Sequence, residues 1–462
     1  MAKRNKFWVV LTIFFILVFG GIFLKYLFKD QRPNIILVTL DALRPDHLGC
    51  YGYPRNTSPN IDKLAGEGII FDNAISHSTH TAPAMTSILT GLYPDRARVF
   101  EFGDKIFGKD FTLSCLLKNN GYATAFFSSH VSIASIKGFD DSFDTFYSIW
   151  TFRQDKNNKS LKVTEINNRI TQWLKLNRNK KFFLWVHYLE PHYPMNPPVH
   201  YKNMFAGNYS ANAAIRVPVS KDPAFGFGGI PLMLAETNGY RQDLNYYINL
   251  YDAAIRYADD CIGDLIDELK NLGLDRKTIV IISSDHGESL GEHGEYFTHG
   301  FNLYDELIKV PLVVRFCSFE PASKRIDTQV GLVDLMPTIL ELTGTKEPLG
   351  IEGRSLMPSI RGDSSCSDRY LLGFTATNKL AVRTNNWKLI YDQNSKQYEL
   401  YDLKNDPQEL NNLVFKEREQ FKLLKNKLDS RLKQIQYDPR KKNKVILDEE
   451  SQQRLRSLGY LG

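Results

Sequence analysis

Short apolar runs rich in β-branched residues recur along this chain, and they restrict its fold more than any other feature. The first covers residues 34–40 (Asn-Ile-Ile-Leu-Val-Thr-Leu), and similar runs lie at 123–128, 182–187, 278–283 and 310–316. A strand in the interior of a parallel sheet is buried on both faces and has this continuous apolar pattern. The runs therefore predict a mostly parallel sheet.

Helical periodicity lies between these runs. Ile166, Ile170 and Leu174 fall on one face of a predicted helix, and Ile255 and Ile262 fall on one face of another. The alternation of strands and helices predicts an α/β fold with helices on both faces of the sheet. Ligands of such folds bind at the carboxyl ends of the strands.

The sequence changes character after about residue 355, where two short strands at 381–383 and 387–391 predict a small C-terminal antiparallel α+β subdomain. We therefore divide the chain into an N-terminal anchor (1–30), a main domain (31–355), a C-terminal subdomain (356–415) and a charged helical tail (416–462).

The anchor is predicted from the uncharged run between Phe7 and Leu24. With the apolar residues that follow it, this run approaches the roughly 20 residues needed to cross a bilayer. A cleaved signal peptide is the alternative, but its apolar region is usually about 7–15 residues and ends in a small-residue cleavage site, which this run lacks. We expect a single-pass membrane protein whose body lies outside the cytoplasm.

Charge and cysteine content exclude several functions. Lys and Arg (58) exceed Asp and Glu (52) by only six, and the basic clusters lie at the two ends of the chain, so no nucleic-acid partner is predicted. The five cysteines are scattered without a Cys-x-x-Cys pair, so neither a disulfide framework nor a cysteine zinc site is indicated.

Acidic residues follow two of the predicted strands. Asp41 comes directly after the first run, and Asp285 and His286 follow the run at 278–283. Alone, Asp41 could cap a helix and His286 could be an ordinary polar residue. Because the carboxyl ends of parallel strands meet at one edge, the residues together predict an oxygen-rich site for a divalent cation.

A helix predicted to begin at Thr81 and to stop at Gly91 lies between these two positions in the sequence. Pro83 suits its first turn, and Gly91 suits its end. Free amide groups at a helix N-terminus favour an anion such as sulfate or phosphate, and a hydroxyl there could act as a nucleophile. The alternative is that Thr81 only caps the helix.

Motifs in this order resemble the sulfatase family of the alkaline phosphatase superfamily. They are residues 40–52 and 57–62, 81–83 with 89–94, 285–288 with 309–312, 333–338, and 399–403 with 406–413. The resemblance covers nearly all of residues 33–415. It implies an alkaline-phosphatase-like sheet and makes residues 31–355 a catalytic domain.

The resemblance also implies site roles. It makes Asp41, Thr81, Asp285 and His286 metal ligands, Thr81 the nucleophile, His192 a contact of the transferred anion, His299 the group that assists the leaving group, and His187 and His130 candidate substrate contacts. The cation is calcium, magnesium, manganese or zinc, and Glu190, His192 and His299 are candidates for holding a second one. His187 and His293 have the alternative of being ordinary surface or loop histidines.

Some positions depart from the family pattern. Sulfatases of the usual type convert a Cys or Ser in Cys/Ser-x-Pro-x-Arg to formylglycine, whereas this chain has Thr81 and Met85. Ala42 replaces a frequent aspartate, and His130 ends a segment where many sulfatases have a lysine motif. A directly acting threonine is similar to the phosphodiesterases and the phosphoethanolamine or glycerophosphate transferases of the superfamily.

We therefore expect a membrane-anchored hydrolase of sulfate or phosphate esters, carried by a glycan or a lipid, that uses Thr81 and turns over phosphate esters better. The alternatives are a transferase that acts on an envelope lipid or glycan, and an inactive pseudoenzyme that binds an anionic glycan.

Overall fold

A central eight-stranded sheet organises the computed structural model, which describes residues 30–106, 111–130, 133, 136, 138–148, 162–206, 215–222, 225–317, 324–363 and 369–435. Its strand order is β10 (Lys324–Ile326), β2 (Ile69–Phe71), β9 (Leu312–Arg315), β7 (Thr278–Ser284), β1 (Asn34–Asp41), β6 (Phe182–Pro191), β4 (Ala123–Ser128) and β5 (Thr145–Ser148). Each of the five apolar runs forms strand in this sheet, as predicted.

The sheet is mostly parallel. Strands β5, β4, β6, β1 and β7 pair in parallel, whereas β9 runs antiparallel to both β7 and β2. The run predicted at 310–316 is interrupted at Pro311, which has no N–H to donate. Before it, β8 (Lys309–Val310) joins β3 (Ala74–Ile75) and β11 (Val330–Gly331) in a small separate sheet.

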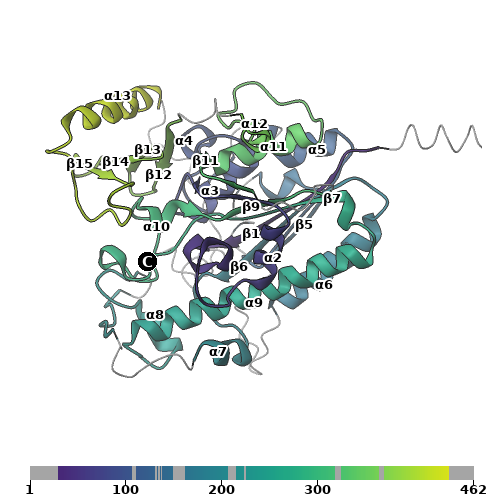
Figure 1. Ribbon diagram of the computed structural model, residues 1–462, viewed down its shortest axis with the longest axis horizontal. Helices are drawn as coiled ribbons and strands as arrows, with labels where there is room; N and C mark the ends of the chain where they lie inside the picture. Colours follow the sequence, from purple (N-terminus) through teal and green to yellow (C-terminus); the bar gives the residue numbers. More distant parts are fainter. Residues whose placement is uncertain are drawn as a thin grey trace, which may run out of the picture.

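Both faces of β1 are buried. Ile36 and Val38 belong to the core on one face, with side chains of α2, α6 and α9, while Ile35 and Leu37 belong to the core on the other, with α3, α5 and α11. Figure 1 shows these two groups of helices on opposite sides of the sheet. The helices are α2 (Pro59–Gly66), α3 (Thr81–Thr90), α4 (Pro94–Ala97), α5 (Leu113–Asn119), α6 (Lys162–Asn177), α7 (Val199–Phe205), α8 (Leu232–Thr237), α9 (Leu244–Asn271), α10 (Asp305–Ile308), α11 (Leu335–Leu342), α12 (Met357–Arg361) and α13 (Arg418–Gln434).

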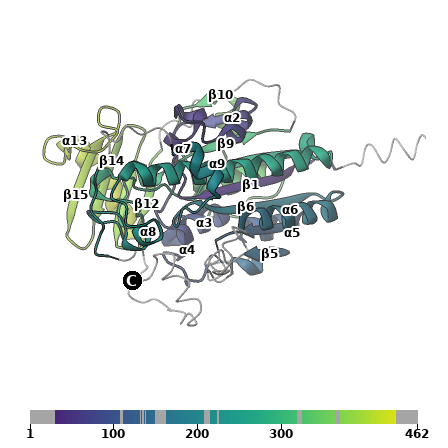
Figure 2. The same cartoon turned by 90° about the horizontal axis from the view of Figure 1, so that it is seen from below.

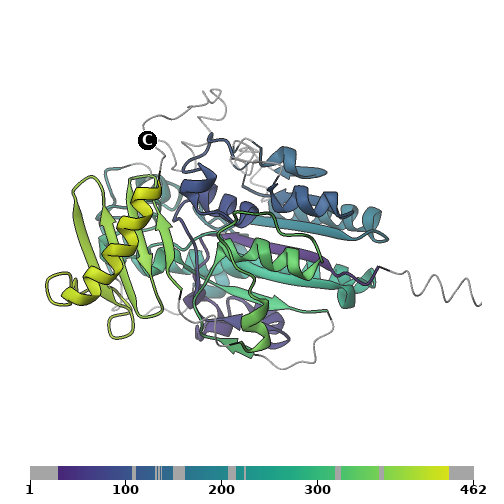
Figure 3. The ribbon, with the colours of Figure 1, turned by 90° about the horizontal axis from the view of Figure 1, so that it is seen from above.

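A second, antiparallel sheet lies beyond the carboxyl ends of the parallel strands (Figure 2). It contains β12 (Leu371–Phe374), β13 (Lys379–Arg383), β14 (Trp387–Asp392) and β15 (Gln397–Asp402). Leu424 and Leu428 of α13 are buried in one core with residues of this sheet, and Figure 3 shows the helix lying across it. The predicted C-terminal antiparallel sheet is therefore present.

The predicted anchor between Phe7 and Leu24 lies outside the described residues. Within the ranges that the structure does describe, no helix is long and apolar enough to cross a membrane.

Candidate active site

Parallel pairing brings the carboxyl ends of β1, β6 and β7 to the same level. Thr39 of β1 is in register with His187 of β6 and with Ser283 of β7. Asp41 and Asp285 lie two residues beyond this level, and both side chains are fully buried. The predicted convergence of the two aspartates is confirmed, because equal strand directions place both at one edge of the sheet.

Four side chains face one another around Asp41. Its Oδ1 lies 3.6 Å from Nε2 of His286, and its Oδ2 lies 3.5 Å from Nε2 of His187 and 3.6 Å from Nε2 of His130. Oδ2 of Asp285 lies 3.4 Å from Nε2 of His286. The centre therefore combines carboxylate oxygens with imidazole nitrogens, in a region closed to solvent.

Burial and like charge set the protonation of the two aspartates. Burial raises the pKa of Asp41 well above its ordinary value, and the negative charge of Asp285 raises it further. Burial also acts to raise the pKa of Asp285, but the imidazoles of His286 and His187 overcome it and leave that pKa lowered. A cation at this point would relieve the repulsion between the two carboxylates.

Unpaired atoms show that a divalent cation fits here. Both side-chain oxygens of Asp41, Oδ2 of Asp285 and Nε2 of His187 are buried without a hydrogen-bond partner among the described residues. Asp41, His187 and Asp285 each offer a ligand atom within 4.8 Å of the others. Buried polar atoms are costly unless they are paired or bind a metal, so this cluster has the composition of a metal site.

His286 presents a lone pair to the cluster. Its Nδ1 lies 2.8 Å from the carbonyl oxygen of Gly287. A carbonyl only accepts, so Nδ1 carries a proton, and Nε2 is the nitrogen that faces the two aspartates. This tautomer is the one that a metal ligand requires.

Thr81 is the first residue of α3 and is fully buried. Its Oγ1 lies 3.3 Å from Nε2 of His286. The N-cap is His80, so the alternative that Thr81 itself caps the helix is wrong. The helix ends at Gly91, which takes the left-handed conformation (φ 65°) that glycine adopts without strain.

His192 and His299 form one side of the centre. The ring of His299 lies 4.4 Å from that of His286 and 5.0 Å from that of His192. Nδ1 of His299 lies 3.3 Å from the carboxylate of Glu288. Burial raises the pKa of Glu288 to about 7 and lowers the pKa of His299. A proton shared by the two groups is therefore held by Glu288 in preference to His299.

The sequence interpretation needs three corrections. His187 is not a surface or loop histidine but a fully buried residue of β6 beside Asp41. Glu190, His192 and His299 do not form a second ligand cluster among the described residues. Glu288 was not singled out, although it ends the motif at 285–288 and contacts His299.

His293 lies apart from this cluster. Its ring stacks on that of Tyr304 with centroids 3.7 Å apart, and its Nε2 lies 3.7 Å from Glu306. The interpretation of His293 as an ordinary loop histidine agrees with this position.

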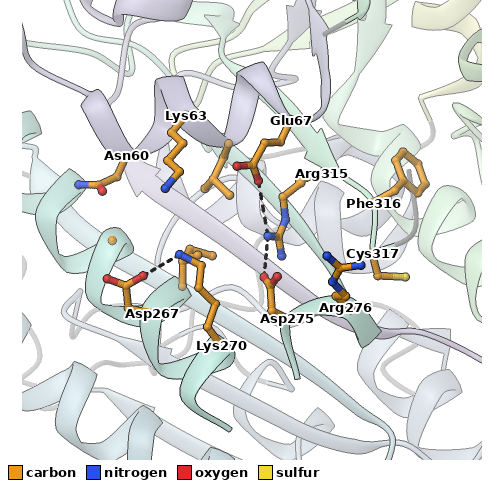
Figure 4. A pocket seen from close by; sticks show the side chains of 13 residues that line it. Asn60, Lys63, Glu67, Asp267, Lys270, Asp275, Arg276, Arg315, Phe316 and Cys317 are labelled. Carbon is orange, nitrogen blue, oxygen red and sulfur yellow. Dashed lines mark hydrogen bonds and ion pairs between the residues drawn. The ribbon is translucent and has the colours of Figure 1, made fainter. Parts of the chain in front are cut away.

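A cavity of about 720 Å³ lies at the other end of the strands, near the amino end of β7, between α2, α9 and the end of β9 (Figure 4). The side chain of Arg315 lines this cavity, and its Nη1 lies 2.6 Å from Asp275 and 3.9 Å from Glu67. Asp275 precedes β7 and Asp285 follows it, so the length of a strand separates this cavity from the aspartate cluster.

The chain matches two family profiles. The profile described as Sulfatase covers residues 33–345, and the one described as N-sulphoglucosamine sulphohydrolase, C-terminal, covers residues 291–438. An iduronate 2-sulfatase of Mus musculus is 29% identical over 68% of this chain and 69% of its own length. An N-acetylglucosamine-6-O-sulfatase of Bacteroides thetaiotaomicron is 24% identical, with 84% of each chain covered.

Solved structures share the fold. A protein in complex with its substrate D-glucosamine-2-N,6-O-disulfate superposes with a TM-score of 0.72 at 23% identity, covering 89% of this chain and all of the other. The phosphonate monoester hydrolase of Agrobacterium radiobacter gives a TM-score of 0.71 at 20% identity, covering 87% and 95%. These likenesses confirm the predicted fold class.

Proposed function

Since this chain belongs to the sulfatase family of the alkaline phosphatase superfamily, we propose that it hydrolyses a sulfate ester carried by a saccharide, with Thr81 as the nucleophile. Membership of the family makes the chain an ester hydrolase. The names of its relatives, an N-acetylglucosamine-6-O-sulfatase and iduronate 2-sulfatases, support a sulfated amino sugar or uronic acid as the substrate.

The contact between Thr81 and His286 carries the proposal. Oγ1 of Thr81 lies 3.3 Å from Nε2 of His286, in the same buried cluster as Asp41 and Asp285. The hydroxyl also lies at the N-terminus of α3, where backbone N–H groups favour a bound anion. The side chain is therefore placed to attack the sulfur or phosphorus of an ester bound at that end of the helix.

A divalent cation would be held by Asp41, Thr81, Asp285 and His286, and the buried oxygens of Asp41 and Asp285 that have no hydrogen-bond partner among the described residues fit one. When bound, it supplies positive charge that offsets the charge developing on the ester oxygens. The residues themselves then have separate tasks. Oγ1 of Thr81 attacks the sulfur with loss of its proton to water and displaces the alcohol, whose oxygen takes a proton from Nε2 of His299 while Nδ1 of His299 takes one from Glu288. His192 contacts the anion. Water then attacks the same sulfur, which releases sulfate and restores the Thr81 hydroxyl.

Phosphate esters are a second candidate substrate class, favoured by one observation. Thr81 replaces the Cys or Ser from which formylglycine is made, and Met85 replaces the arginine of the same motif, so no aldehyde hydrate can expel the transferred group. Release of the transferred group from Thr81 then needs a second displacement by water, at sulfur in a sulfo-threonine or at phosphorus in a phospho-threonine.

A substrate panel tests this proposal. The purified protein, supplied in turn with calcium, magnesium, manganese and zinc, is given a sulfated disaccharide, an aryl sulfate, a phosphate monoester and a phosphate diester. We expect metal-dependent sulfate release from the saccharide, measured by ion chromatography. Turnover of phosphate esters alone would replace the proposed function with the second candidate.

Two controls separate the remaining alternatives. An added acceptor alcohol that captures the transferred group in preference to water would identify a transferase. A metal-loaded protein that binds sulfated saccharide in calorimetry but releases no anion would be a binding protein without activity.

We also propose that the segment between Phe7 and Leu24 anchors the chain with residues 31–355, 356–415 and 416–462 outside the cytoplasm. The full chain should stay in the membrane fraction after a carbonate wash, and a chain that begins at Arg32 should not. A reporter that is active only in the cytoplasm should be silent when it is fused after Gly462. Release of a shortened soluble form would show cleavage instead.

A further inference from the structure

We propose that His187 is a direct ligand of the cation, and that Asp41, His187, Asp285 and His286 together select zinc or another first-row transition ion over calcium. This inference rests on the proposed function for the presence of a cation. It adds a ligand and a class of metal, both of which can be measured without any substrate.

The position of His187 supports a ligand role. It lies on β6, its side chain is fully buried, and its Nε2 is 3.5 Å from Oδ2 of Asp41. Its Nε2 and the ligand atoms of Asp41 and Asp285 lie within 4.8 Å of one another. Two zinc ligands at about 2.0–2.2 Å from the ion are separated by about 3.3–3.5 Å in a tetrahedral site. The distance between His187 and Asp41 is of this size.

The other ring nitrogen of His187 is held by a side chain of β1. Nδ1 lies 2.8 Å from Oγ1 of Thr39, and the same oxygen accepts a hydrogen bond from Nε1 of Trp185 at 2.9 Å. The Thr39 hydroxyl can donate to the carbonyl of Val186 at 3.5 Å, which leaves its oxygen free to accept from Nδ1 of His187. Such a fixed partner orients a metal-binding histidine and places its lone pair on Nε2.

Residue 42 contributes no ligand atom. Ala42 is fully buried, and its N–H donates to Oδ1 of Asp285 at 3.2 Å, so its backbone lies at the edge of the cluster. Its φ is 60°, in the left-handed region, which aspartate adopts more readily than most other non-glycine residues. An aspartate at this position would therefore add a carboxylate next to the cluster without a new backbone strain.

The donor set decides the class of metal. Calcium takes six to eight oxygen ligands and magnesium a near-octahedral set of oxygens, whereas imidazole nitrogens favour zinc, manganese and related ions. His187 and His286 offer two nitrogens to this cluster, beside the oxygens of Asp41 and Asp285. Two nitrogens and two carboxylates correspond to a zinc-type site.

The experiment compares metal binding by the full chain in detergent, stripped with a chelator and reloaded. Zinc and calcium affinities are measured by competition with a chromophoric chelator, and bound metal is counted by mass spectrometry. We expect wild type to bind one zinc in preference to calcium. His187→Gln should lower zinc affinity by at least about 100-fold, and Thr39→Val by about 10-fold.

His293→Gln is the matched control, because it makes the same change at a histidine outside the cluster and should leave zinc affinity unchanged. Ala42→Asp should raise calcium affinity relative to zinc. Cobalt-loaded wild type should show a visible absorption band that reports its nitrogen ligands, and this band should change in Thr39→Val even if His187→Gln does not fold.

The inference is overturned if His187→Gln binds zinc as tightly as His293→Gln, or if wild type prefers calcium. If wild type binds zinc through His187 but hydrolyses no ester, this inference holds and the proposed function is wrong. If wild type hydrolyses an ester but His187→Gln binds zinc as wild type does, the proposed function holds and this inference is wrong.

Discussion

Thr81→Ala is expected to lower kcat by at least about 1,000-fold, because it removes the group that forms the covalent bond to the substrate. Oγ1 is the only part of this side chain that can act as a nucleophile, and it faces His286 at 3.3 Å. The fold should be retained, since the N-cap of α3 is His80 and alanine is a strong helix former at residue 81. Steady-state kinetics on the substrate that performs best in the panel would measure the loss.

Two companion variants make this result specific. Thr81→Ser keeps the hydroxyl and should retain measurable turnover, with a rapidly quenched sample carrying one sulfo or phospho group on that residue. Thr86→Val removes a hydroxyl of the same helix that only donates to the carbonyl of Ala82 at 2.8 Å, and it should stay active. Wild-type rates in Thr81→Ala, or an aldehyde at residue 81 in the peptide mass, would exclude threonine as the nucleophile.

The convergence of the site could be predicted from the sequence because strand direction follows from the α/β pattern. Asp41 follows the run at 34–40 directly, Asp285 follows the run at 278–283 after one residue, and parallel strands place both at one edge. The direction of β9 could not be predicted, because an apolar run has the same pattern in either direction. Pro311 was the one local sign that the run at 310–316 is divided between two sheets.

Side-chain positions within the site were harder to predict. His187 lies in a strand that is buried on both faces, so alternation gives no sign of which way its ring points. Only the register of β6 with Thr39 places it beside Asp41. Glu288 could have been found from its place in the motif at 285–288, but its contact with His299 depends on the loop that follows β7.

Lys388→Met is expected to lower the free energy of unfolding by about 3–5 kcal/mol, the usual cost of removing one partner from a buried ion pair. Lys388 is fully buried, and its Nζ lies 2.7 Å from Asp305 and 2.8 Å from Glu409. It also donates to the carbonyl of Leu303 at 2.9 Å. Methionine fills a similar volume but leaves the buried carboxylate of Glu409 without its cation, while Asp305 keeps Arg383 at 2.6 Å.

The stability lost in Lys388→Met should increase as the pH rises, because of the titration of Glu409. Burial raises the pKa of Glu409 to about 7 although Lys388 opposes this, so its contribution to stability declines as the pH rises towards 7. Without Lys388 the pKa of Glu409 rises further, so the decline continues to a higher pH. The difference from wild type in urea unfolding should therefore be larger at pH 8 than at pH 5.

Lys404→Met is the matched control, since this lysine is exposed on the turn after β15 and its loss should change stability by less than about 0.5 kcal/mol. The effect of Lys388 should also reach the active site. Asp305 begins α10, at the end of the segment that carries His286 and His299, and Lys388 joins this segment to the C-terminal sheet. If the two variants unfolded at the same urea concentration at both pH values, the ion pairs of Lys388 would not stabilise the contact between the C-terminal sheet and the segment that carries His286 and His299.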